Sequence, residues 1–346
     1  MRDKTDCGVF LKYASQECGD GLGAQAQRIM GIYSASHSLG LGYIHEEIQT
    51  IELNPGDPFS AVHERAIYLE KANRLFCLPS STSVRPARSI RLQRLTRRNL
   101  FFIRQLNRMA KTFRFPIEVE LPLSLPWSDE NPDTYSVAAD LIRPRIQMEG
   151  EGKIVRVDVH IRRALSPKVG NSGHAYDRYV STDWYRGVVR EIVSYLSDGN
   201  LQYEIRIHTD IPKARWKVPE DTSAGTLAMW KHHKLLDDDG YLVDQSEDLE
   251  KAFNDLGPVT VAREWDPVDV IKSMATADIL VICASSLSYV AGLIRGDKLT
   301  VAPIFFHTNP TNWQTISAEM IENEKIALYN RLSQQFKLEN RAVHEK

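Results

Sequence analysis

The chain has 346 residues, of which 42% are hydrophobic and 25% are charged, and its formal net charge at pH 7 is −2. This length suggests roughly two domains, and the charge balance argues against a general nucleic-acid-binding protein, which usually carries a basic excess. No apolar run is long enough to span a membrane, and the first residues lack the apolar segment of a signal peptide. We therefore expect a cytoplasmic protein without a transmembrane segment.

The first elements in chain order read as a strand, a glycine-rich turn, a helix and a second strand. The strand spans 9–15, the helix 24–39 and the second strand 41–44. The turn between strand and helix makes Gly21 and Gly23 candidate ligand-binding residues, because amides at a helix start can bind an anion. The turn also fits the G-x-G-x-x-A pattern of dinucleotide-binding folds, with Glu46 or Glu47 about 20 residues further on. A tight turn that needs glycine for its backbone angles is the simpler alternative.

Two segments follow that carry no obvious chemistry. Residues 85–114 hold ten arginine and lysine residues and no acidic residue, and the interleaved apolar residues predict a helix. Such a run is usually a solvated face, and the alternative is a surface that docks an anionic acceptor or partner. Residues 121–152 contain four prolines and end near the Gly150 and Gly152 pair, which is typical of an interdomain connection.

Residues 153–163, KIVRVDVHIRR, alternate apolar and polar residues, as in a strand with one buried face. The strand ends in His160, Arg162 and Arg163, and a loop containing proline and glycine follows. In an open α/β sheet, ligands lie outside the carboxyl ends of the strands. Because guanidinium groups are forked and permanently charged, two of them at this position suit a phosphate or diphosphate. Most adjacent arginine pairs are solvated surface residues, and this stretch alone leaves that alternative open.

The second half continues the alternation of strands and helices. Ser181 caps a helix that runs to about Leu196, and a strand over 203–207 precedes Asp210. Asp266-Pro267 begins another helix, and the apolar run 277–283 is typical of a buried parallel strand. Ser285, Ser286 and Ser288 follow this strand, at the start of a helix that runs to about Arg295, and 316–339 reads as a long terminal helix.

The βαβαβα pattern occurs twice, which predicts an α/β fold of two Rossmann-like halves. We expect an N-terminal domain over 1–150, a C-terminal domain over 151–312 and a terminal helix over 313–346. In one arrangement, that helix packs back on the N-terminal domain. The cysteines lack C-x-x-C and zinc-type spacing, so we expect reduced structural thiols and no metal site. They are Cys7, Cys18, Cys77 and Cys283.

Five motifs, in this order over about 270 residues, together resemble the fucosyltransferases of the α1,2, α1,6 and protein-O-fucose group. The Lys-Val-Gly motif and the glycine turn look most like the α1,6 branch, which includes the rhizobial Nod-factor enzyme. The motifs are Gly19-Asp20-Gly21-Leu22-Gly23-Ala24-Gln25, His160-Ile161-Arg162-Arg163, Lys168-Val169-Gly170, Thr209-Asp210-Ile211-Pro212, and Ala277-Asp278-Ile279-Leu280-Val281 leading to Ser285-Ser286.

The resemblance implies a GT-B-like pair of Rossmann-type domains that face a cleft. It further implies metal-independent, inverting transfer of fucose from GDP-fucose to the hydroxyl of a glycan or glycoconjugate, with the donor held mainly by the C-terminal domain. In that family the arginines of the HxRR motif contact the donor diphosphate, which indicates Arg162 and Arg163. Departure of the nucleoside diphosphate leaves negative charge, and fixed guanidinium groups stabilise charge as it develops.

The other candidates each have a functional and a structural interpretation. Ser285, Ser286 and Ser288 either bind phosphate or ribose or simply cap a helix. Asp210 either accepts a hydrogen bond from a guanine edge or ribose hydroxyl, or forms an Asx turn before a proline. By strand alternation, His160 points to the face opposite that of Ile161 and Arg163, the two neighbours of Arg162. His160 either orders the site or is a core histidine.

The chain departs from the family at two positions. Ala24 stands where the glycine turn often continues with a polar residue, and 171–174 supply no acidic residue after the Lys-Val-Gly motif. The candidate bases are therefore Asp20, His174 and Asp177. Two alternatives stay open, a non-catalytic module that binds nucleotide sugars or glycans and a transferase that uses another nucleotide sugar. The sequence does not indicate an oligomeric state.

Overall fold

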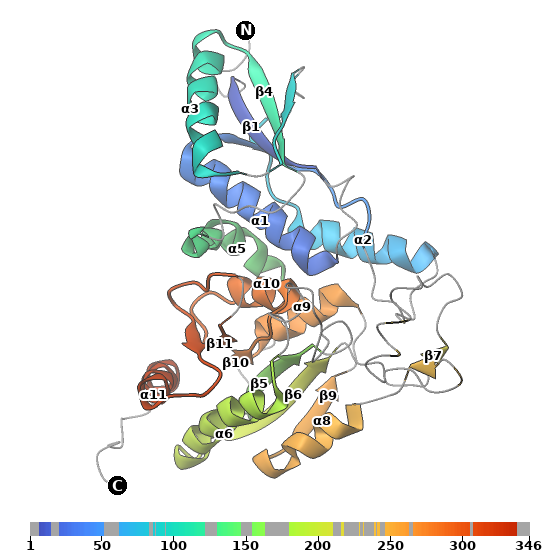
Figure 1. The fold of residues 1–346 in the computed structure, drawn as a ribbon, viewed down its shortest axis with the longest axis vertical. Coiled ribbons are helices and arrows are strands. Elements are labelled where there is room, and N and C mark those ends of the chain that lie inside the picture. The colour runs from blue at the N-terminus through green and yellow to red at the C-terminus, as the bar shows by residue number, and fades with distance from the viewer. Residues whose placement is uncertain are drawn as a thin grey trace. The chain divides into compact units, whose positions relative to one another are not determined.

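The computed structural model describes 7–14, 21–51, 62–82, 86, 88–93, 95–121, 130–146, 154–162, 180–209, 216–217, 228, 231, 239, 241–242, 246–262, 266–304 and 307–337. The chain divides into two compact units (Figure 1). Unit 1 comprises 1–53 and 59–147, and unit 2 comprises 54–58 and 148–346. Among the described residues, no helix is long and apolar enough to cross a membrane.

Unit 1 is built on a parallel four-stranded sheet in the order β2-β1-β4-β3. The strands are β1 (Gly8–Tyr13), β2 (Gly42–Ile44), β3 (Ser89–Arg91) and β4 (Pro116–Leu121). Tyr13 on β1 donates its hydroxyl to Gln25 on helix α1 (Leu22–Leu39), whereas a Cβ on Gly8 would meet Asn107 on helix α3 (Arg97–Thr112). Because side chains alternate across a strand, α1 and α3 cover opposite faces of the sheet.

The helix ends of unit 1 follow from local sequence. Helix α1 ends at Gly40, whose φ of 63° is left-handed and therefore favours glycine. Helix α3 begins with a reciprocal capping box, in which Thr96 and Asn99 each bond the backbone N–H of the other. Helix α2 (Val62–Phe76) precedes β3.

Residues 130–146 were expected to belong to a connection, but they fold into three short helical segments, of which the first two pack against α1 and the third packs against the second. These are η3 (Pro132–Tyr135), α5 (Ser136–Ile142) and η4 (Arg143–Arg145). Tyr135, Ala138, Ala139 and Ile142 are fully or almost fully buried, so a short apolar face outweighs the loop-like composition around it. The expected helix over 85–114 is likewise divided into β3 and α3.

Unit 2 contains a parallel six-stranded sheet in the order β12-β11-β10-β5-β6-β9. The strands are β5 (Ile154–Ile161), β6 (Gln202–Thr209), β9 (Val259–Ala262), β10 (Ile279–Val281), β11 (Thr300–Pro303) and β12 (Gln314–Ile316). A separate antiparallel pair joins β7 (Trp216–Lys217) and β8 (Tyr241–Leu242).

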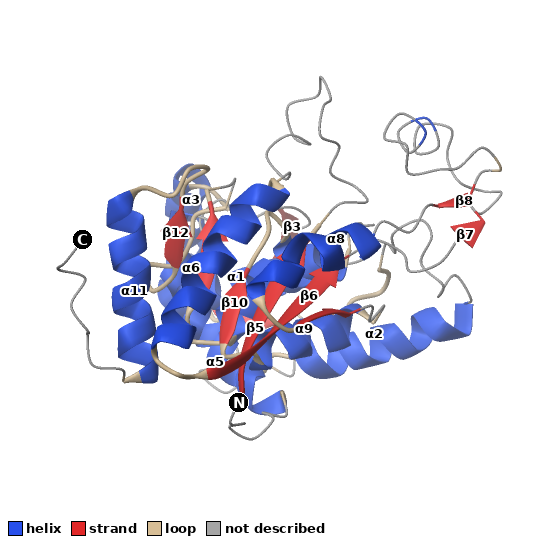
Figure 2. Ribbon diagram, turned by 90° about the horizontal axis from the view of Figure 1, so that it is seen from below, coloured by secondary structure: helices blue, strands red, loops and turns tan. Residues whose placement is uncertain are grey.

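Helices cover both faces of this sheet (Figure 2). On one face α6 (Thr182–Asp198), α8 (Ser246–Phe253) and α11 (Glu322–Phe336) share a hydrophobic core with the odd-numbered valines of β5, and η6 (Asn254–Leu256) follows α8. On the other face Arg156 of β5 bonds to Ser273 and Thr276 of α9 (Pro267–Thr276). Helix α10 (Ser286–Ile294) packs beside α9. Each fully buried valine or leucine contributes about 1.5–3 kcal/mol to stability.

The predicted α/β fold with two parallel-sheet halves is confirmed. Strand β5 differs in detail from its prediction, because both of its faces are buried and only Ile154 is exposed. Of the segment predicted as a terminal helix, residues 314–316 are strand β12, and α11 begins only at Glu322. Helix α11 packs on α6 and β12, where Tyr329 donates to Glu191 at 2.6 Å.

Candidate functional site

The candidate site lies where the strand order of unit 2 reverses. From β5 the chain continues through β6 to β9 on one side, and then returns to β10 and proceeds through β11 to β12 on the other. Strands β5 and β10 are neighbours and parallel, so their carboxyl ends flank this switch point. In open parallel sheets, ligands bind in the crevice at such a point.

Arg162 and Ser285 come together at this edge from positions 123 residues apart in the sequence. Arg162 follows β5 directly and donates from Nη1 to Ser285 Oγ at 3.4 Å. Ser285 is the N-cap of α10, and its Oγ also accepts from the backbone N–H of Leu287 at 3.3 Å. A half-buried guanidinium therefore lies beside the N-terminus of a nine-residue helix, which is an arrangement suited to an anion.

The remaining serines differ from each other. Ser286 is half-buried, and its Oγ lies 3.5 Å from His307 Nε2, on the connection that follows β11. The His307 ring also packs on Tyr289, with ring centroids 5.1 Å apart. His307 was not among the expected site residues, because no motif surrounds it.

Ser288 does not lie where a ligand contact was expected. Its side chain is fully buried, and its hydroxyl bonds to the carbonyl oxygens of Ser285 at 3.3 Å and Cys283 at 3.4 Å. Local backbone acceptors therefore hold this hydroxyl inside the turn. Ser288 shapes the start of α10, and Ser285 and Ser286 lie toward the edge.

His160 lies beneath the site and is 4% exposed. Its Nδ1 is 3.1 Å from the sulfur of Cys283, which lies two residues before Ser285, the N-cap of α10. Burial lowers the pKa of His160 to about 3, with the charges of His208 and Arg162 acting in the same direction. The imidazole is therefore neutral at physiological pH, and it joins the end of β5 to the segment that precedes α10.

A buried ion cluster continues from His160 toward the middle of the sheet. Asp158 is fully buried and accepts from Arg156 Nε at 3.1 Å and from His208 Nε2 at 2.8 Å. Sequence reasoning missed this cluster because it treated β5 as a strand with one solvated face. The signal was present, since polar residues alternate with apolar ones both in β5 and in its neighbour β6.

Arg295 fixes the backbone around α10 from its other end. This guanidinium is 5% exposed and donates to carbonyl oxygens at 2.8–3.1 Å. Burial lowers the pKa of Arg295 to about 10, against the opposing charges of Asp158 and Asp278. The four acceptors belong to Met274, Ala277, Asp278 and Leu299.

In unit 1, Gly21 is the exposed N-cap of α1, and Gly23 is buried in its first turn. Glu46, which a dinucleotide-binding unit would offer to a ribose, pairs with the buried Lys12 at 2.9 Å. Burial by itself lowers the pKa of Lys12, but the hydrogen bond to Glu46 and the nearby carboxylates outweigh burial and raise it. This pair was also missed, because Lys12 lies on β1 and Glu46 lies 34 residues later, beyond the end of β2.

Several predicted site residues lie outside the described residues. They are Asp20, Arg163, His174, Asp177 and Asp210. Within the described part of the chain, no group of three or more histidine, cysteine, aspartate or glutamate side chains is placed to hold a metal ion.

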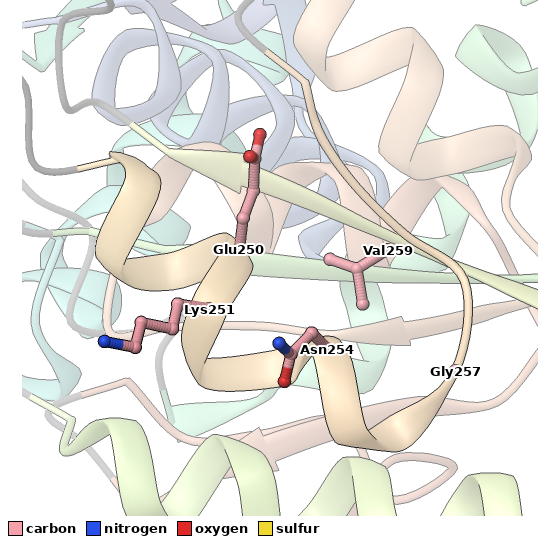
Figure 3. A pocket seen from close by; sticks show the side chains of 5 residues that line it. All are labelled: Glu250, Lys251, Asn254, Gly257 and Val259. Atoms are coloured by element: carbon pink, nitrogen blue, oxygen red, sulfur yellow. The ribbon is translucent and has the colours of Figure 1, made fainter.

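A hollow of about 500 Å³ lies over α8 and the start of β9 (Figure 3). It is lined by Glu250, Lys251, Asn254, Gly257 and Val259. Val259 pairs with Ile205, which is four residues before the end of β6. The hollow therefore lies toward the amino ends of the strands, away from the edge that carries Arg162 and Ser285.

No protein-family model matches the sequence, and the comparison with curated proteins found no match. Similar solved structures include the E. coli heptosyltransferase WaaC with ADP (10% identity, 94% of this chain, 99% of that chain, TM-score 0.39). They also include POFUT1 in complex with GDP-fucose (11% identity, 89% of this chain, 99% of that chain, TM-score 0.43). A third is the NodZ alpha-1,6-fucosyltransferase soaked with GDP-fucose (10% identity, 83% of this chain, 92% of that chain, TM-score 0.33). These likenesses are too distant to assign a family, so the interpretation rests on the residues of the chain itself.

Proposed function

We propose that the chain is a glycosyltransferase that transfers fucose from GDP-fucose to a hydroxyl of a glycan or glycoconjugate, with inversion and without a metal ion. The observation that carries this proposal is the contact between Arg162 and Ser285 at the switch point of unit 2. It supports an anion site formed by a guanidinium and a helix N-terminus. The order of the HxRR, Lys-Val-Gly and Ser-Ser motifs supports fucose and guanine as the donor components.

In the proposed reaction, the acceptor hydroxyl attacks the anomeric carbon of the sugar while the bond to the diphosphate breaks. Negative charge grows on the leaving diphosphate, and Arg162, assisted by Arg163, stabilises this charge electrostatically. The start of α10 contributes its backbone N–H groups and the positive end of its dipole. His160 is a positioning residue, because its bond to Cys283 joins the two strand ends that carry Arg162 and Ser285.

The donor proposal is tested by thermal unfolding in the presence of EDTA with GDP, GDP-fucose, UDP and ADP. A ligand at about 100 times its dissociation constant adds roughly 2.7 kcal/mol to the free energy of unfolding. We expect this stabilisation from the two guanine compounds. Stabilisation by UDP or ADP alone would indicate that the donor is a nucleotide sugar with that base and not GDP-fucose. Binding of GDP-fucose without hydrolysis or transfer would favour a non-catalytic binding module.

The role of the arginines is tested by Arg162→Lys and Arg163→Lys. Lysine keeps the charge but loses the planar fork, so we expect turnover to fall by at least about 10²-fold at one of the positions. Arg190→Lys, a substitution of an exposed arginine on α6, is the matched control. Near-normal turnover in both site variants would remove the HxRR segment from the mechanism.

A further inference from the structure

Helix α3 exposes an unusual number of large apolar side chains. Phe101 is 68% exposed, Phe102 is 51%, Met109 is 53% and Phe113, at the C-cap, is 69%. Single exposed apolar residues are ordinary, but four on one helix form a patch that calls for a binding partner. The helix itself is anchored, because Leu100, Ile103 and Ala110 on its other side are buried.

The apolar side chains gather along one line of the helix surface. Phe102, Met109 and Phe113 are related by spacings of seven and four residues, which return to the same side of a helix with 3.6 residues per turn. Phe101 points about 100° away from this line, toward the side that carries Arg104 and Arg108. Helix α3, which carries these side chains, runs alongside β1 and β4 in unit 1 (Figure 1).

A line of cations lies on the other border of the exposed side of α3, at least about 120° around the helix from Phe102. Arg104, Arg108 and Lys111 follow the same helical spacing and form a second exposed line, and Arg98 and Arg114 are exposed at the two ends. Within the described residues, none of these five side chains forms an ion pair, and no acidic residue occurs between positions 85 and 114. The charge therefore remains available to an external anion.

We propose that the α3 outer surface, defined as Phe101, Phe102, Met109, Phe113 and the five cations around them, binds an anionic lipid bilayer. A bilayer interface supplies the two chemistries that this surface needs together, anionic headgroups for the cations and acyl chains for the aromatic residues. A second copy of the chain would place one cationic surface against another, which is repulsive. A nucleic acid would satisfy the charges, but the net charge of −2 is unlike that of a nucleic-acid-binding protein.

The binding mode follows from the anchoring of α3. Leu100 and Ile103 hold the helix on its own sheet, so only the outer side chains enter the lipid. The phenylalanines reach just below the headgroups, while Arg104, Arg108 and Lys111 remain level with the phosphates, as in other interfacial helices. Binding of this kind is peripheral, reversible and sensitive to salt.

Co-sedimentation of the full chain with vesicles tests the proposal. We expect binding to vesicles of roughly two parts phosphatidylcholine to one part phosphatidylglycerol at low salt, and no binding to phosphatidylcholine alone. Arg104→Gln, Arg108→Gln and Lys111→Gln should each weaken partitioning about fivefold, and together roughly 100-fold. Phe101→Ser, Phe102→Ser and Phe113→Ser should each weaken it about tenfold.

A matched control carries Ile67→Ser and Arg74→Gln on α2, which remove an exposed apolar side chain and an exposed cation from another helix of unit 1. This control should bind vesicles as the unaltered chain does. An independent reporter is Phe102→Trp, whose fluorescence should be quenched by brominated acyl chains. All substituted positions are solvent-exposed, so each variant should keep the circular dichroism of the folded chain.

Three outcomes would overturn the proposal. The first is the absence of binding to anionic vesicles, and the second is equal loss of binding in the α2 control. The third is loss of binding in the charge variants together with full binding in the phenylalanine variants. This last result would show attraction to any polyanion and would point to an acidic protein or a single-stranded nucleic acid as the partner. Each measurement is independent of donor binding in unit 2.

Discussion

At the scale of single residues, His160 couples the site to the pH of the solution. Burial holds its pKa at about 3, whereas in the unfolded chain the histidine titrates near 6.5. The folded state therefore binds fewer protons than the unfolded state between these two values. The contribution of the buried, neutral His160 to the free energy of unfolding is therefore complete above about pH 6.5, and it is lost progressively as the pH falls toward 3.

We predict that the free energy of unfolding falls by up to about 1.4 kcal/mol per pH unit within this window because of His160. Urea unfolding of the unaltered chain and of His160→Asn, measured between these two pH limits, isolates this contribution. The difference between the two proteins should shrink as the pH falls. A constant difference would mean that His160 is protonated in the folded state.

The proton acceptor of the proposed transfer is also a question of single residues. Asp20, His174 and Asp177 remain the candidates, and all three lie outside the described residues. Asp20 ranks first because it belongs to unit 1, whereas the proposed donor site belongs to unit 2. We predict that Asp20→Asn binds GDP normally but loses at least about 10²-fold in transfer. His174→Asn and Asp177→Asn serve as the comparison, and a larger loss in either would move the base there.

At the scale of elements, Arg295 joins three backbone segments through four hydrogen bonds. It bonds the end of α9, the residue before β10 and the residue before β11, all through carbonyl oxygens. Removing such a buried guanidinium breaks four hydrogen bonds to backbone carbonyl oxygens and disturbs the entry into β10 and therefore α10.

We predict that Arg295→Met lowers the free energy of unfolding by about 3 kcal/mol or more. The melting temperature should fall by roughly 6–12 °C, if about 2–4 °C corresponds to 1 kcal/mol in a domain of this size. Arg190→Met on α6, which removes an exposed arginine with a long ion pair of 3.8 Å to Asp255, should change it little. Equal effects at the two positions would show that the backbone bonds of Arg295 contribute nothing to stability.

The elements also show what sequence patterns can and cannot predict. Local signals were sufficient for α6, α9 and α10, because Ser181, Asp266 and Ser285 cap these helices through their own side chains. They were insufficient for β9, β11 and β12, which are three or four residues long and owe their structure to neighbouring strands. Strands this short carry too few residues for a periodic pattern to be distinct.

At the scale of the whole molecule, the two-unit α/β organisation follows from alternating strands and helices, whereas the site depends on strand order. The meeting of Arg162 and Ser285 requires that β10 insert beside β5, and no local pattern specifies this insertion. The same holds for the bond between Asp158 and His208, which needs β6 on the other side of β5. Resemblance to a family supplied the site residues, and topology alone explains why they are close together.

This topology makes a prediction about the whole chain that hydrogen–deuterium exchange can test. If GDP binds at the switch point of unit 2, it should slow exchange in peptides that contain the end of β5 and the start of α10. For openings that require release of the nucleotide, the reduction should be about 100-fold at 100 times the dissociation constant. Peptides from α2 and α3 should exchange as they do without nucleotide. Protection that appears instead at the start of α1, around Gly21 and Gly23, would place the nucleotide on the glycine turn of unit 1.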